Sequence, residues 1–155
     1  MKKMAMIVLA AAGLAVAAQA DVPLQLGILG DPLQVFSAER PVTGLKLNVP
    51  FAESDVAAGI DVGFVGSVGD FTGLRLNAVN LSSGYVSGLE IGLLNIGQGE
   101  THGMQFAAYN QAGDMHGFQL GLINSAKALK GLQIGVINFV TTGRVQALPF
   151  IIYAF

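Results

Sequence analysis

The chain is built from a short unit that recurs at a nearly constant spacing. Two neighbouring copies read Gly117-Phe-Gln-Leu-Gly-Leu-Ile-Asn124 and Gly131-Leu-Gln-Ile-Gly-Val-Ile-Asn138. Seven copies follow one another at steps of 14 or 15 residues, beginning at Gly44, Gly59, Gly73, Gly88, Gly103, Gly117 and Gly131. A short period that continues through most of a chain is typical of repeat architectures, in which each unit packs on its neighbours.

Within each unit, apolar residues alternate with other residues. In the sixth copy one face would carry Phe118, Leu120 and Leu122, while the opposite face would carry Gly117, Gln119 and Gly121. A period of two indicates a β-strand with one buried face, and two glycines per unit oppose a helix. We therefore predict an all-β chain with one strand per repeat, an apolar face that forms the core and a polar face that is exposed.

The polar face has one regular position, the second residue after each repeat glycine. It is occupied in turn by Lys46, Asp61, Arg75, Glu90, Gln105, Gln119 and Gln133. We expect the row from Arg75 to Gln133 to form a flat polar strip on the outer surface, where it could bind a glycan or a partner protein. Five of the units end in asparagine, which suits a corner of the chain: Asn80, Asn95, Asn110, Asn124 and Asn138.

Two architectures accommodate such repeats. In a β-solenoid each repeat is one coil, and equivalent residues stack about 4.8 Å apart. The alternative is a small up-and-down outer-membrane β-barrel or meander of 8–10 strands with antiparallel neighbours. A lipid-facing strand needs roughly ten residues with alternate apolar side chains, whereas each repeat supplies three, and the connectors show no two-repeat alternation. We favour the solenoid, in which stacked asparagines would form a hydrogen-bonded ladder.

The ends of the chain differ from the repeats. Residues 1–20 have a basic start, an apolar run and an Ala18-Gln19-Ala20 sequence, which together predict a secretory signal peptide. Residues 21–43 contain three prolines and are expected to form an N-terminal cap on the repeat region, residues 44–142. Residues 143–155 form a C-terminal segment that is apolar from Ala147 to Phe155, consistent with either a terminal strand on the stack or the closing strand of a barrel.

Charge and cysteine content narrow the function classes. After removal of residues 1–20 the chain would keep six Lys and Arg against ten Asp and Glu, which gives a net charge of −4. Nucleic-acid binding is therefore not expected, because it requires a basic face. The absence of cysteine means that an exported domain must be stabilised by packing and backbone hydrogen bonds alone.

The repeats and the C-terminal sequence Leu148-Pro-Phe-Ile-Ile-Tyr-Ala-Phe155 together resemble a family of bacterial surface repeat-containing proteins. The resemblance covers nearly all of the chain after residue 20. It implies a protein of the cell envelope without an assigned biochemical role, located at the outer membrane or cell surface, or alternatively in the periplasm. It carries no catalytic residues over to this chain.

Catalytic groups are scarce, because the chain has no cysteine, two histidines and no nucleophile motif. We therefore predict a non-enzymatic, exported structural or interaction protein without a cofactor, with an unknown envelope partner and a tendency to self-associate or to associate with the outer membrane.

One cluster of side chains could bind a divalent metal ion such as zinc. Glu100, His102, Asp114 and His116 repeat the order acid-x-His-Gly fourteen residues apart, which would stack the two histidines in a solenoid and separate them in a barrel.

Overall fold

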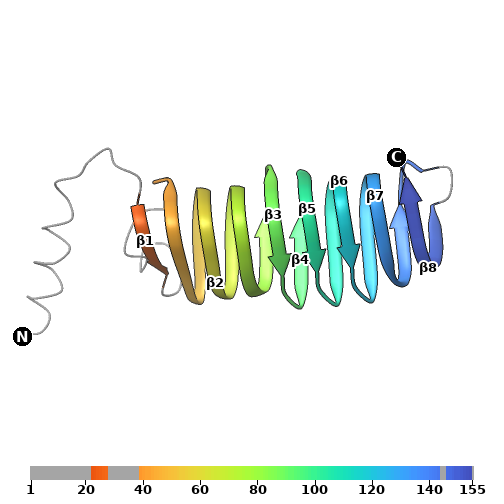
Figure 1. Cartoon of the computed structure of the whole chain (residues 1–155). Helices are drawn as coiled ribbons and strands as arrows, with labels where there is room; N and C mark the ends of the chain where they lie inside the picture. Colours follow the sequence, from red (N-terminus) through yellow and green to blue (C-terminus); the bar gives the residue numbers. More distant parts are fainter. Residues whose placement is uncertain (1–21, 28–38, 144–145, 155) are drawn as a thin grey trace, which may run out of the picture.

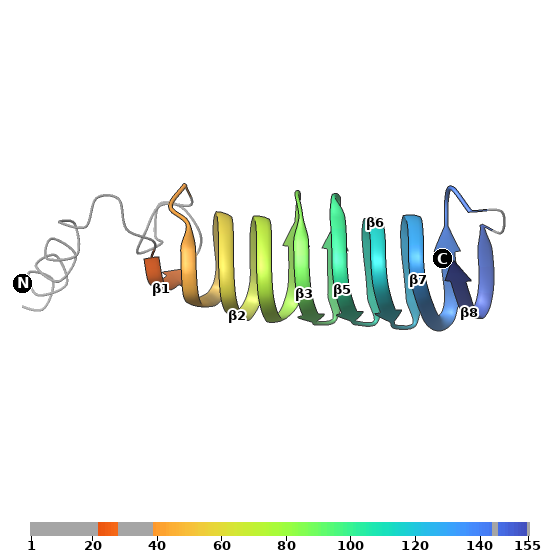
Figure 2. The ribbon, with the colours of Figure 1, turned by 45° about the horizontal axis from the view of Figure 1, so that its top comes forward.

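The computed structural model describes residues 22–27, 39–143 and 146–154, and these residues form a β-solenoid (Figure 1). Successive coils stack along one axis, and the same stack is visible after a 45° turn (Figure 2). The predicted signal peptide, residues 1–20, and the part of the predicted cap between residues 28 and 38 lie outside the described residues. The part of the chain that the model describes has no helix long and apolar enough to cross a membrane.

Eight strands make up a single sheet that winds around the axis. Parallel pairing joins the first seven, and β8 is antiparallel to β7. Parallel neighbours exclude the alternative of an up-and-down barrel. The strands are β1 (Val22–Gly27), β2 (Val42–Ser82), β3 (Val86–Ile91), β4 (Leu94–Gly97), β5 (Glu100–Phe106), β6 (Tyr109–Leu120), β7 (Ile123–Val140) and β8 (Ala147–Ala154).

The repeat period of the sequence is the coil period of the structure. Equivalent glycines pair across neighbouring strands, in the series Gly73, Gly88, Gly103, Gly117 and Gly131. The prediction of one strand per repeat joined by connectors was too simple, because β2, β6 and β7 continue as strand through the expected connectors. Backbone pairing between coils therefore extends almost all the way around the solenoid.

The first glycine of each repeat has a specific backbone role. All seven repeat glycines have positive φ, for example 138° at Gly103 and 142° at Gly117. A Cβ atom at Gly117 would lie 2.1 Å from the carbonyl oxygen of Gly103 in the coil before it. A side chain at this position would clash with the neighbouring coil as well as strain its own backbone, which explains why the repeat begins with glycine.

The polar face of the repeat lies inside the solenoid, so the predicted orientation of the strands was wrong. The side chains of Gln105, Gln119 and Gln133 are fully buried. The expected flat outer strip for a glycan or a partner does not exist, because its members line the interior. Apolar residues that were expected to form the core, among them Leu93, Leu122 and Val136, lie on the outside and are more than half exposed.

Hydrogen bonds between successive coils link the buried glutamines, and Oε1 of Gln133, the last of them, has no hydrogen-bond partner. Gln133 donates a side-chain hydrogen bond to Gln119, Gln119 to Gln105 and Gln105 to the carboxylate of Glu90, over 2.6 to 2.7 Å. We call Gln105, Gln119 and Gln133 the glutamine ladder. Burial of amide groups costs little when each finds a partner, and a stack of equivalent residues supplies that partner automatically. The ladder ends at β8, where Gln133 faces Ile152.

Earlier coils replace glutamine with alternating charges, Lys46, Asp61, Arg75 and Glu90, which we call the charge ladder. Arg75 is fully buried and pairs with Asp61 at 3.2 Å and with Glu90 at 2.9 Å. Its guanidinium group also donates to the carbonyl oxygens of Gly66 and Leu81. Burial lowers the pKa of Lys46 to about 8, with the nearby carboxylate of Asp61 acting in the opposite direction. The interior thus holds two positive and two negative charges in alternation.

The asparagines form the ladder predicted for a solenoid. Each donates to the next one along the axis over 2.8 to 2.9 Å, in the series Asn80, Asn95, Asn110, Asn124 and Asn138. The repeats that begin at Gly44 and Gly59 lack this asparagine. There Asn48, at another interior position, donates to Asn77 of the third repeat, which in turn donates to Asn80. We call this set the asparagine ladder.

The interior also contains two apolar clusters. The first contains Val42, Val68, Phe71 and Val86, and the second contains Met115, Ala126, Leu129 and Ile152. At the N-terminal end β1 pairs in parallel with β2 and places Gln25 beside Lys46, so this strand of the predicted cap continues the parallel pairing of the coils. At the C-terminal end β8 covers β7, which agrees with the interpretation of the last segment as a terminal strand.

Candidate functional site

The two histidines lie in equivalent positions of adjacent coils, as predicted for a solenoid. His102 in β5 pairs in parallel register with His116 in β6, and each lies directly before a repeat glycine. The same column of the solenoid holds Ser87 before His102 and Lys130 after His116. The site therefore lies on the polar side of the coils, where neither an apolar core nor a ladder fixes the residue type.

The imidazole rings stack on each other. Their centroids are 4.4 Å apart and their planes differ by 6°. Glu100 is the acidic member of the cluster: its Oε1 lies 2.6 Å from Nε2 of His102 and 3.4 Å from Nε2 of His116. One ligand atom from each of these three residues lies within 4.8 Å of the others. Parallel stacking thus brings together three groups that bind metal ions.

Asp114, the fourth predicted member, does not join the group. It pairs in register with Glu100 but is exposed and lies outside the three-residue cluster.

The hydrogen bond to His102 holds the pKa of the Glu100 carboxyl below its ordinary value, and the charges of His102, His116 and Lys130 act in the same direction. Glu100 is therefore a carboxylate at neutral pH, the form that coordinates metal ions.

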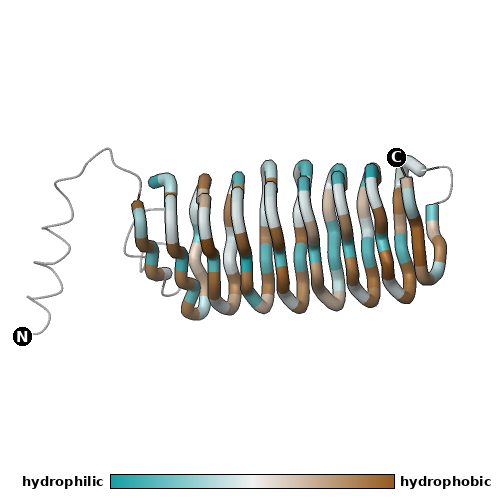
Figure 3. The backbone as a smooth tube through the Cα atoms, in the orientation of Figure 1, coloured by the Kyte–Doolittle hydropathy of each residue, from teal (hydrophilic) through white to brown (hydrophobic). Residues whose placement is uncertain are grey.

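The outer surface opposite the histidine column is apolar. In the coils that begin at Gly88, Gly103 and Gly117 the chain bends at the fourth and fifth residues after the glycine, and in every repeat the fifth residue is at least partly exposed. We call the fifth residue of each repeat the bend residue. The most exposed of these bend residues are Val49, Phe64, Leu93, Leu122 and Val136, at 55 to 65 %. Figure 3 shows these apolar bends along the lower edge of the solenoid and polar residues along the upper edge.

Further apolar residues flank the bend on both sides. Ile91 and Leu120 lie before it, Leu94 and Ile123 lie after it, and all four are exposed. We call the bend residues together with these flanking columns the apolar edge. An exposed apolar surface that continues along a whole molecule is uncommon on a soluble monomer and marks an interaction site. Alternation along the strand identified the members of this surface but did not show that they face outward.

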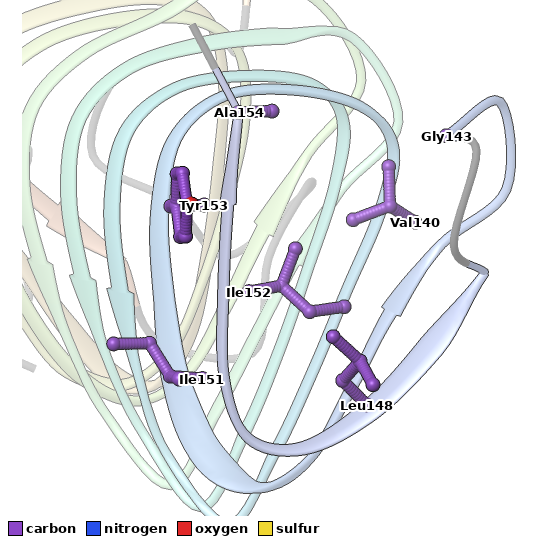
Figure 4. Close-up of a pocket in the computed structure, with 7 residues that line it drawn as sticks. All are labelled: Val140, Gly143, Leu148, Ile151, Ile152, Tyr153 and Ala154. Atoms are coloured by element: carbon purple, nitrogen blue, oxygen red, sulfur yellow. The ribbon is translucent and has the colours of Figure 1, made fainter.

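A separate apolar pocket of about 390 Å³ lies at the C-terminal end of the stack. Val140, Leu148 and Ile152 point into it from β7 and β8 (Figure 4). Its volume is in the range of small-molecule sites, but such sites also need polar groups that fix the orientation of the ligand. The lining residues include no charged side chain. We therefore interpret the pocket as the incompletely covered end of the solenoid interior.

The chain matches no model of a known protein family, no curated protein and no solved structure in the comparisons that we made. The function proposed below therefore rests on the residues and geometry of the solenoid.

Proposed function

We propose that the protein is a non-enzymatic, exported component of a bacterial cell envelope, and that it acts as a scaffold whose apolar edge lies in a lipid surface. The observation that supports this most directly is the row of outward bend residues, which are more than half exposed in five coils. The predicted signal peptide and the resemblance to surface repeat proteins support the envelope location.

The apolar edge carries no acidic or basic side chain. The first, third, fifth and sixth residues after each repeat glycine are all apolar apart from Tyr109, from Leu45 in the first repeat to Ile137 in the last. Charged residues are expensive in lipid, so their absence from four columns over seven coils favours a lipid environment. The charges that the coils need are inside, in the charge ladder, or on the opposite side with Glu100 and Lys130.

The backbone N–H groups at the bend are also hydrogen-bonded within the protein, as a lipid environment requires. The N–H of Gly92 donates to the carbonyl of Phe106 in the next coil, and the N–H of Leu93 donates to Ala78 in the previous coil. From inside, the asparagine ladder supplies a second donor to the strand ends, for example from Asn95 to Phe106. Backbone groups that face lipid must be satisfied within the protein, and coil stacking meets this requirement.

The shape of the surface favours lipid over a second copy of the chain. The apolar columns lie on both sides of the bend, so the surface is a convex edge and not a plane. A second solenoid would cover only one of the two flanks, whereas the hydrocarbon region of a membrane deforms around both. A protein that lies in the interface in this way buries apolar side chains and keeps its polar side in water.

Binding to vesicles tests this proposal. We expect the protein to float with phosphatidylcholine vesicles, with little change between low and high salt, because the contact is apolar and not electrostatic. The double variant Leu93→Ser/Leu122→Ser should keep its circular dichroism spectrum, because both side chains are exposed. Its partition into vesicles should fall at least about tenfold, since the burial of each leucine contributes roughly 1 to 3 kcal/mol.

The matched control is Lys127→Ser, an exposed position away from the apolar edge. Its partition should equal that of the unchanged protein. The proposal is wrong if the protein stays in the aqueous phase in the presence of vesicles, or if the double variant floats as well as the control. Sedimentation as a dimer that vesicles do not dissociate would assign the apolar edge to a second copy of the chain instead.

A further inference from the structure

We propose that Glu100, His102 and His116 bind one zinc ion, which links two adjacent coils. The site is separate from the apolar edge and lies on the opposite, polar side of the solenoid. Two imidazoles and one carboxylate form a ligand set that zinc accepts, with the fourth position left to solvent. The proposal does not depend on lipid binding, because none of the three residues belongs to the apolar edge.

The distances between the ligand atoms are close to those that zinc requires. Bonds of 2.0 to 2.2 Å in tetrahedral directions place ligand atoms roughly 3.3 Å apart. Glu100 Oε1 already lies 2.6 Å from His102 Nε2 and 3.4 Å from His116 Nε2. The largest separation within the set is at most 4.8 Å. Both Nε2 atoms lie next to the same carboxylate oxygen, which places the three ligand atoms around one point.

The cluster is open enough for an ion to enter and for the rings to turn. The side chains of His102 and His116 are 40 % and 29 % exposed, and that of Glu100 is 47 % exposed. The carboxylate contributes a negative charge that offsets part of the charge of the ion, and exposed Asp114 adds another one coil further on. The backbone pairing of β5 with β6 holds the ligands in register before the ion arrives, which lowers the ordering cost of binding.

The position directly before each repeat glycine distinguishes the coils of His102 and His116 from their neighbours. Its neighbouring members are Ser87 and Lys130, which also precede repeat glycines but offer no imidazole. Serine and lysine are accommodated at this position, so substitution of either histidine by another polar residue should leave the fold intact. Loss of binding in such variants would therefore report on the ligands themselves.

Calorimetric titration of the untagged protein with zinc chloride tests the site, because the chain has only two histidines. We expect one zinc ion per chain. His102→Gln and His116→Gln should each weaken binding by at least about tenfold, since even loss of a group that only orients a ligand costs 10- to 100-fold. Glu100→Gln should also weaken binding, and zinc should raise the urea midpoint of the unchanged protein more than that of these three variants.

Asp114→Asn is the matched control, because it removes an acidic group from the neighbouring coil and not from the cluster. Its affinity for zinc should remain within about twofold of the unchanged value, well below the effect of losing a ligand. The proposal is overturned if the unchanged protein shows no heat of binding at submillimolar zinc, or if the histidine variants bind as tightly as the control. A larger loss in Asp114→Asn than in the histidine variants would also overturn it.

Discussion

Replacement of Arg75 by glutamine is expected to lower the free energy of unfolding by about 3 to 5 kcal/mol. Arg75 lies fully buried between Asp61 and Glu90 and donates to two backbone carbonyls. Without it, two buried carboxylates face only one buried cation, Lys46. An uncompensated charge in the interior is far more costly than an ion pair, so the loss exceeds that of an ordinary polar substitution. Urea unfolding followed by circular dichroism measures the difference.

The double variant Arg75→Gln/Glu90→Gln should be compared with the single variant Arg75→Gln. It removes one charge of each sign and extends the glutamine ladder from Gln105 by two coils. We expect it to recover more than half of the stability that the single variant loses, because every amide again has a counterpart one coil away. A single variant that costs less than about 1 kcal/mol, or a double variant less stable than the single one, would contradict the role assigned to the charge ladder.

Replacement of Gly117 by alanine is expected to be at least as damaging, with a loss of about 4 kcal/mol or more. Its φ is 142°, a conformation that side chains rarely adopt, and the added Cβ would lie 2.1 Å from the carbonyl oxygen of Gly103. Neither the backbone nor the neighbouring coil can relax without loss of the pairing between β5 and β6. Urea unfolding of the purified variant, or its recovery only as unfolded chain, measures the effect.

Gly97→Ala is the matched control, because Gly97 is also a strand glycine with little exposure but lies at another repeat position. Its φ is not positive, and the nearest atom to an added Cβ is the Ser82 hydroxyl at 3.2 Å. Ala112 and Ala126 occupy the corresponding position of later coils. We expect a change within about 1 kcal/mol, with stabilisation if the entropy of the unfolded chain dominates. Equal losses for Gly117→Ala and Gly97→Ala would show that the repeat glycines have no special role.

Much of the fold follows from spacing alone. The constant step of 14 or 15 residues, the alternation within each unit and the asparagine at its end predicted stacked β-coils with an asparagine ladder, and the structure confirms them. The stacking of His102 on His116 followed from the same register. Parallel stacking places equivalent residues side by side, so any pattern that recurs at the coil period becomes a column in space.

The spacing could not predict which of the two faces of each strand points into the solenoid. Alternation shows which residues share a face, and the usual rule then assigns the apolar face to the core. The rule does not hold in this solenoid, because glutamines stacked in successive coils form hydrogen bonds with one another and can therefore be buried. One signal did point inward: the alternating signs of Lys46, Asp61, Arg75 and Glu90 at a single repeat position. Opposite charges on successive coils contribute little on a solvated face, whereas a buried column of charges requires them.

The central claim is that the glutamine ladder is inside and the apolar edge is outside. Hydrogen exchange of the side-chain amides, followed by NMR on protein labelled with ¹⁵N at glutamine, tests it without any substitution. The amide groups of Gln105, Gln119 and Gln133 are fully buried, so we predict that their protons exchange only when coils open, far more slowly than those of the exposed Gln98. Exchange of all four at the rate of free glutamine would place the glutamine face in solvent and contradict the account.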